Sequence, residues 1–199
     1  MSKKKNIIVL VLVLVLLIGG ASVLYTQLGK GDTPDQLLIQ GDQDKNDNGS
    51  QNNSSGTDEE QKLTKAPDFS VYDESGNKVN LSDYFGKPIV LNFWASWCGP
   101  CQSEMPDFYE KYLELGDEIH FLMVNMTGGR ETLSSAKAFL SEKGYTFPVF
   151  YDTDSDAAIT YSVYSLPTTY FLDAEGNIVA QATGAISVDT LQRGIDMIK

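Results

Sequence analysis

One apolar run constrains the fold of this 199-residue chain more than any other feature of its sequence. Residues 88–95, PIVLNFWA, contain Asn92 as their only polar side chain. Because such a run offers no polar face to water, it predicts a central, buried strand. We expect a helix from about Cys98 to Leu115 to follow it, bent near Pro106 because proline lacks a backbone donor.

Strand-like and helix-like patterns alternate along residues 63–199, which is typical of an α/β domain. The expected elements besides those above are a hairpin over 69–81 with its turn at 74–77, a second central strand at 119–126, an amphipathic helix at 131–143, an inserted strand and helix at 147–151 and 155–161, a hairpin over 168–183 and a closing helix at 187–198. We therefore predict one folded domain in residues 63–199.

Residues 7–24 carry no charge and follow three consecutive lysines, Lys3 to Lys5. As a helix this stretch is about 27 Å long, close to the thickness of a bilayer's hydrocarbon core. It predicts a single-pass membrane anchor in residues 1–28, with the rest of the chain outside the cytoplasm. The alternative is a cleaved signal peptide and a secreted protein, because Gly19 and Ala21 resemble a small-residue cleavage pattern.

Residues 29–62 are rich in Gly, Asp, Asn, Gln and Ser. A segment of this composition buries too little apolar surface to offset the entropy of ordering. We therefore expect a flexible acidic linker between the anchor and the domain.

Charge and composition narrow the function classes. The net charge of −12 disfavours nucleic acid as a partner, since an acidic surface repels phosphates. Two cysteines and one histidine do not make a closed zinc site, so we predict neither a metal nor another cofactor. His120 lies in the apolar run 119–126, and we interpret it as an interior strand residue.

Cys98 and Cys101 stand three residues apart where the buried strand meets the following helix. Unpaired N–H groups at a helix start stabilise an anion, so the first thiol is expected to be acidified and nucleophilic. A stabilising disulfide is the alternative, but a loop this short constrains the unfolded chain very little. The pair therefore predicts redox chemistry.

Several motifs resemble the thioredoxin superfamily: Trp97-Cys98-Gly99-Pro100-Cys101 after an apolar strand, Pro106 in the helix, and Leu166-Pro167-Thr168 before a late strand. Ala66-Pro67-Asp68-Phe69, Leu81-Ser82-Asp83 and the anchor with its linker resemble the TlpA/ResA-type membrane-bound members. The resemblance covers residues 63–199. It implies a thioredoxin-like α/β fold, with a central mixed sheet flanked by helices, and a cis peptide before Pro167 packed against the cysteines.

The resemblance implies a role for each site residue. Cys98 attacks a partner disulfide, and Cys101 resolves the mixed disulfide. Trp97 and the loop Leu166-Pro167-Thr168 form an apolar rim for substrate docking. Gly99 and Pro100, between the cysteines, resemble the pair found in reducing thioredoxins, which favours reduction of partner disulfides over their oxidation.

Proton transfer departs from the commonest thioredoxin pattern. Many thioredoxins carry a buried Asp at the position of Asn92, where it moves protons for the second cysteine, and an amide cannot do this. Glu104 matches a carboxylate that TlpA/ResA-type proteins carry beside the site, so we predict it as the proton carrier. The alternative is an ordinary exposed helix residue.

Two other functions fit the same fold. A peroxiredoxin-type thiol peroxidase usually places its reactive Cys after Pro and Thr or Ser, which Trp97-Cys98 does not match. A copper-delivery module would have more widely spaced cysteines and a downstream His. The expected partners are disulfide-containing or dithiol proteins outside the cytoplasm and a membrane electron donor. An apocytochrome in cytochrome c maturation, an oxidised surface protein and a methionine sulfoxide reductase are all open candidates.

Overall fold

A computed structural model describes residues 35–39 and 63–199 of the chain. The strands are β1 (Leu38–Ile39), β2 (Thr64–Lys65), β3 (Ser70–Tyr72), β4 (Lys78–Asn80), β5 (Ile89–Trp94), β6 (His120–Asn125), β7 (Val149–Tyr151), β8 (Thr168–Leu172) and β9 (Asn177–Thr183). The helices are the 3-10 helix η1 (Leu81–Tyr84), α2 (Gly99–Leu115), α3 (Leu133–Lys143), α4 (Asp156–Thr160) and α5 (Val188–Ile198).

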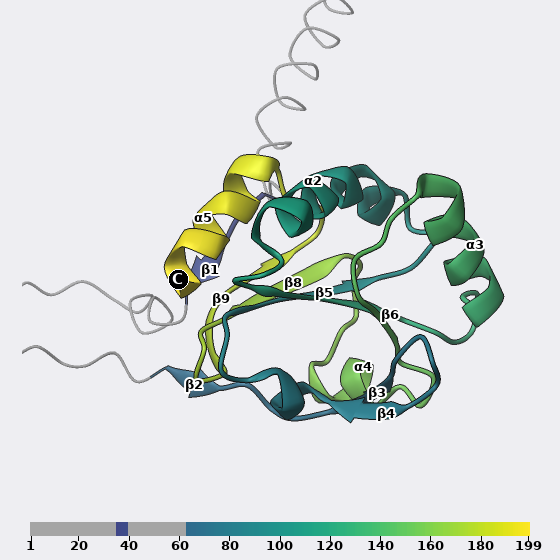
Figure 1. Cartoon of the computed structure of the whole chain (residues 1–199), viewed down its shortest axis with the longest axis horizontal. Helices are drawn as coiled ribbons and strands as arrows, with labels where there is room; N and C mark the ends of the chain where they lie inside the picture. Colours follow the sequence, from purple (N-terminus) through teal and green to yellow (C-terminus); the bar gives the residue numbers. More distant parts are fainter. Residues whose placement is uncertain (1–34, 40–62) are drawn as a thin grey trace, which may run out of the picture. The chain divides into compact units, whose positions relative to one another are not determined.

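The strands form one mixed sheet, in the order β1-β9-β8-β5-β6-β7-β3-β4, with β2 also paired to β9. The predicted central strand is β5, which pairs parallel with β6 and antiparallel with β8. Helices α2, α3 and α5 lie on one face of the sheet and α4 on the other (Figure 1). This arrangement confirms the predicted thioredoxin-like α/β fold.

Side chains of β5 alternate between two apolar cores. Val90 and Trp94 pack in the core shared with α2, α3 and α5, whereas Leu91 and Phe93 pack in the core on the other face. Each of these buried side chains contributes about 1.5–3 kcal/mol. Asn92 points to the same face as Val90 and Trp94, because successive strand residues alternate. The one polar residue of the apolar run therefore faces α2, the helix that follows the cysteine motif.

Helix boundaries follow local capping. Helix α2 begins directly after Cys98 and contains Pro106. Helix α3 begins at Leu133, two residues later than predicted, because Thr132 caps it: its Oγ1 accepts a hydrogen bond from the Ser135 N–H at 3.0 Å. The residue before the cap, Glu131, is thereby left outside the helix.

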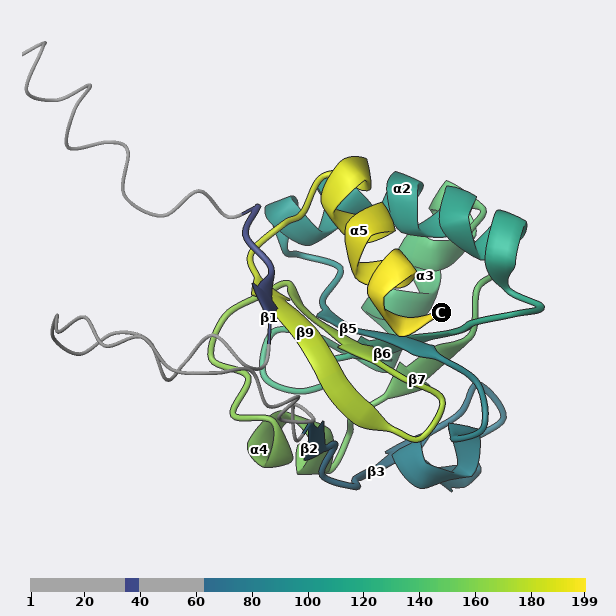
Figure 2. The ribbon, with the colours of Figure 1, turned by 90° about the vertical axis from the view of Figure 1, so that its left-hand side faces the viewer.

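The N-terminal predictions are only partly covered by the described residues. Within the predicted linker, residues 35–39 lie against the domain, where β1 pairs with β9 (Figure 2). This differs from the flexible chain that composition predicts for residues 29–62. The predicted anchor in residues 1–28 lies outside the described residues. Among the described residues, no helix has the length and apolar character needed to cross a bilayer.

Gly194 on α5 allows the helix to pack closely on the sheet. A Cβ at this position would lie 2.3 Å from the ring of Phe171, which is fully buried on β8. We expect Gly194→Ala to destabilise the protein by about 1–3 kcal/mol through overpacking, even though alanine is the better helix former. Denaturant unfolding measures this change.

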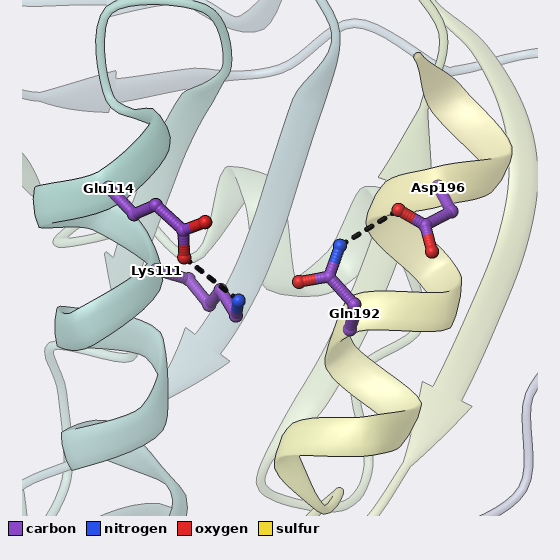
Figure 3. Close-up of polar contacts among 4 residues, drawn as sticks. All are labelled: Lys111, Glu114, Gln192 and Asp196. Atoms are coloured by element: carbon purple, nitrogen blue, oxygen red, sulfur yellow. Dashed lines mark hydrogen bonds and ion pairs between the residues drawn. The ribbon is translucent and has the colours of Figure 1, made fainter.

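The control for Gly194→Ala is Gln192→Ala on the same helix. This variant removes only the 2.8 Å hydrogen bond from Gln192 Nε2 to Asp196 Oδ1 (Figure 3). Such i, i+4 contacts are worth about 0.2–0.5 kcal/mol, so its stability should stay near wild type. Equal stability of the two variants would contradict the close packing of Gly194 on Phe171.

Candidate active site

The two cysteines lie at the junction of β5 and α2 and form a disulfide, with their Cα atoms 5.3 Å apart. Cys98 is the N-cap residue of α2, and its Sγ accepts a hydrogen bond from the Cys101 N–H at 3.2 Å. Cys98 is 4% exposed and Cys101 is fully buried. After reduction, the helix N-terminus favours a thiolate on Cys98. The geometry therefore makes Cys98 the sulfur that a partner can reach.

Exposed residues flank the cysteines in the sequence, whereas Pro167 and Thr168 of the predicted docking loop are buried. Trp97 is 46% exposed, and the guanidinium carbon of Arg130 lies 4.6 Å from the centre of a Trp97 ring. Gly99 and Pro100, between the cysteines, are also exposed. A partner that reaches Cys98 therefore meets an aromatic surface, and the stacked Arg130 adds a positive charge to it.

The Leu166–Pro167 peptide bond is cis, as the resemblance implied. Thr168 pairs with Phe93 near the end of β5, so the cis-proline loop lies beside the end of the strand that leads to Cys98. Pro167 is buried, and its carbonyl accepts a hydrogen bond from the Gly184 N–H at 2.8 Å. The fold thus brings the loop and the cysteine motif to one end of the sheet.

Glu104 is buried, with 3% of its surface exposed, so the alternative of an ordinary exposed helix residue is wrong. Its Oε2 accepts a hydrogen bond from the Ile186 N–H at 3.0 Å, and its Oε1 accepts one from Asn92 Nδ2 at 2.9 Å. Burial raises the pKa of Glu104 to about 7, although these two hydrogen bonds oppose the shift. Glu104 follows Cys101 by three residues on α2, so the two side chains are neighbours on one helix face.

Asn92 positions this carboxyl group. Besides its bond to Glu104, its Nδ2 donates to Thr169 Oγ1 at 3.0 Å, and its Oδ1 has no hydrogen-bond partner among the described residues. The chain thus pairs an amide on β5 with a carboxyl group on α2. The group that titrates lies on the helix, one turn beyond Cys101, rather than on the strand.

Sequence reasoning missed Glu131, which holds the loop before the cysteines. It is 2% exposed, and its Oε2 accepts hydrogen bonds from the Ser96 N–H at 2.7 Å and from Ser96 Oγ at 2.9 Å. Its Oε1 accepts a further bond from Ser135 Oγ at 2.9 Å. Glu131 therefore ties the start of α3 to the residue two positions before Cys98. Nothing in the local sequence signals this contact, because Glu131 resembles a first-turn helix acid.

His120 takes no part in the site. It is the first residue of β6 and pairs with Ile89, at the end of β5 away from the cysteines. Its ring lies edge-on to Tyr84 with centroids 5.5 Å apart, and burial lowers its pKa. The copper-delivery alternative called for more widely spaced cysteines and a downstream histidine, and the fold places His120, the one histidine of the sequence, at the far end of β5 from the cysteines.

The thioredoxin-like fold, with a disulfide-bonded Cys-x-x-Cys motif at a helix start, defines a thiol–disulfide oxidoreductase. A family model described as the AhpC/TSA family matches residues 63–181, and the chain belongs to this family.

Named relatives agree with this class. The chain is 37% identical over 133 residues to the thioredoxin-like protein YneN of Bacillus subtilis, covering 67% of this chain and 78% of that one. It is 39% identical over 137 residues to the thiol-disulfide oxidoreductase ResA of Geobacillus kaustophilus, covering 67% and 76%.

Solved structures are similar as well. The exposed lipoprotein thioredoxin Etrx1 of Streptococcus pneumoniae matches with a TM-score of 0.58 and 33% identity over 65% of this chain and 98% of that one. A DsbF homologue from Corynebacterium diphtheriae matches with a TM-score of 0.60 and 29% identity over 69% and 88%.

Proposed function

We propose that this oxidoreductase reduces disulfide bonds of partner proteins outside the cytoplasm. The observation that carries the proposal is the combination of a reachable sulfur at a helix start with a buried carboxyl group one turn away. Burial raises the pKa of Glu104 to about 7, so this group exchanges a proton readily near neutral pH. The Gly99-Pro100 pair supports reduction as the direction.

The reaction begins from the dithiol. The Cys98 thiolate attacks one sulfur of the partner disulfide, and the other partner sulfur leaves as a thiolate. Cys101 then loses its proton to Glu104 and attacks Cys98, which releases the second partner sulfur. The partner gains two electrons as a dithiol, and the Cys98–Cys101 disulfide of the structure is the product. A membrane electron donor is proposed to restore the dithiol.

The proposed location rests on the sequence and on one relative. The apolar residues 7–24 with lysines before them support a membrane anchor that leaves the domain outside. Etrx1, which is 33% identical, is named as an exposed lipoprotein. We propose the same side of the membrane for this chain, attached through residues 1–28.

Labelling of Cys98 in intact cells tests the location. In the Cys101→Ser full chain, after intact cells are treated with a membrane-impermeant reductant that frees Cys98 from mixed disulfides, we expect a membrane-impermeant thiol reagent to label Cys98 without lysis and the labelled protein to stay with the membrane fraction. The Cys98→Ser, Cys101→Ser double variant is the control, because it has no thiol. Labelling only after lysis would contradict an extracytoplasmic domain, and a soluble protein beginning near Ser22 would show signal-peptide cleavage.

The same Cys101→Ser chain tests the partner class. It should accumulate mixed disulfides with proteins outside the cytoplasm, which mass spectrometry identifies. Captured proteins that carry a disulfide in cells lacking this chain and a dithiol in wild-type cells support reduction. The opposite pattern would show that the chain oxidises its partners.

A further inference from the structure

Residues 35–39 lie within the segment predicted to be a flexible linker, yet they pair with β9 at the edge of the sheet. Leu38 pairs with Gln181 and Ile39 with Ala180, in an antiparallel arrangement beside β9 (Figure 2). Leu37 is partly buried against the apolar core beneath α5. Residues 35–39, three of which are apolar, therefore add a short strand to the domain.

Strands β1 and β2 occupy neighbouring parts of the same side of β9. Ile39 lies opposite Ala180, and Thr64 lies opposite Ile178, two positions earlier in β9. In the described part of the chain, residues 35–39 therefore belong to the same sheet as residues 63–199.

Asp35, just before β1, contacts the loop that leads into α5. Its Oδ1 accepts a hydrogen bond from the Ser187 N–H at 2.9 Å, and its Oδ2 accepts one from Ser187 Oγ at 2.9 Å. Ser187 is the N-cap residue of α5. A carboxylate at this position accepts a hydrogen bond from a backbone N–H at the helix start. Its negative charge also interacts favourably with the positive end of the helix dipole.

The same loop contacts the active site through two of its peptide N–H groups. The Ile186 N–H donates to Glu104 Oε2 at 3.0 Å, and the Gly184 N–H donates to the Pro167 carbonyl at 2.8 Å. Ile186 is the residue directly before Ser187. Asp35 therefore binds the N–H of Ser187, and the preceding N–H, that of Ile186, binds Glu104.

We propose that residues 35–39 are a docking strand that positions the active site, with Asp35 as a positioning residue that holds the Ile186 N–H toward Glu104. The strand places the part of the chain next to the proposed anchor in contact with the loop that binds Glu104. This inference goes beyond the proposed function, because it concerns how the site is assembled rather than what it reduces.

The hydrogen bond from Ile186 favours the ionised form of Glu104, so losing it should raise the pKa of that carboxyl group further. The groups that face Glu104 are Asn92 from β5, the Ile186 N–H from the loop, and the neighbouring Cys101 and Asp107 on α2. Removing the negative charge of Asp35 would by itself lower the pKa of Glu104, because a like charge disfavours ionisation of a carboxyl group. An upward shift therefore reports the lost contact.

The test uses the full chain with Asp35→Ala and, separately, Leu38→Pro, which disfavours the strand but keeps Asp35. In both variants we expect amide hydrogen exchange at Ile186 and Ser187 to be about tenfold faster. The step in the pH profile of Cys98 alkylation that reports Glu104, measured on the reduced chain, should have its pH midpoint raised by about half a unit. Asp189→Asn is the matched control, because it removes an exposed charge from the first turn of the same helix.

Wild-type exchange at these amides in both variants would overturn the proposal, and so would faster exchange with an unchanged pH midpoint. A shift of the same size in Asp189→Asn would also overturn it. Neither readout requires a partner protein. A chain that shows both shifts but reduces no disulfide would support the docking strand and contradict the proposed function.

Discussion

Cys98→Ser is expected to abolish disulfide reduction, lowering the rate of insulin reduction by about 10³-fold or more, since the remaining thiol, Cys101, is buried and cannot begin the reaction. Cys101→Ser should also stop turnover, but it leaves one attack possible and should accumulate a mixed disulfide through Cys98. The difference follows from burial, because Cys98 lies at the helix start beside the exposed Trp97, whereas Cys101 is fully buried. Non-reducing gels and insulin turbidity measure the two outcomes.

Serine is a matched replacement for Cys98. The Cys98 sulfur accepts the Cys101 N–H at the start of α2, and serine is a favourable N-cap residue that accepts the same bond. Thermal unfolding of Cys98→Ser should therefore match that of the reduced wild type, so that lost activity reports lost chemistry. If Cys98→Ser trapped partners and Cys101→Ser did not, the two roles would be reversed.

Local patterns predicted the scaffold of the site. The apolar run forms β5, whose residues are all buried. Its one polar residue, Asn92, is tolerated there because its amide donates a hydrogen bond to Glu104. The helix began at the cysteine motif because Cys98 caps it and Pro100 fits its first turn. The cis peptide before Pro167 came from the family resemblance, since the trans isomer is favoured for an isolated X–Pro bond.

Long-range polar contacts were the part that the sequence did not reveal. Glu131 binds Ser96, and Asp35 binds Ser187 across 152 positions of the chain. Each pairing depends on where the completed sheet places two loops, and the residue types involved are common on surfaces. The composition of residues 29–62 predicts a flexible linker for the segment as a whole, but it does not show that residues 35–39 lie against the domain and that two of them pair with β9.

Glu104→Gln is expected to slow disulfide reduction near neutral pH by about 10²-fold, because it removes the proposed proton acceptor for Cys101. Glutamine keeps the shape of the Glu104 side chain. The Oδ1 of Asn92 has no hydrogen-bond partner among the described residues, so the Asn92 amide can rotate and accept a hydrogen bond from the new glutamine amide. Burial raises the pKa of Glu104 to about 7, so the wild-type alkylation profile of Cys98 should contain a titration near that pH. The variant should lack this step.

Stability gives an independent readout of the same group. Burial raises the pKa of Glu104 from its ordinary value of 4.5 to about 7, so the folded state binds this proton more tightly than the unfolded state. The resulting stabilisation is complete below about pH 4.5 and is lost as the pH rises through about 7, a change on the order of 3 kcal/mol. Glu104→Gln should lack this decline, whereas Glu110→Gln, on an exposed position of the same helix, should keep it. Parallel stability and alkylation profiles for wild type and Glu104→Gln would exclude the proton-carrier role and leave the dithiol reaction of Cys98 and Cys101 intact.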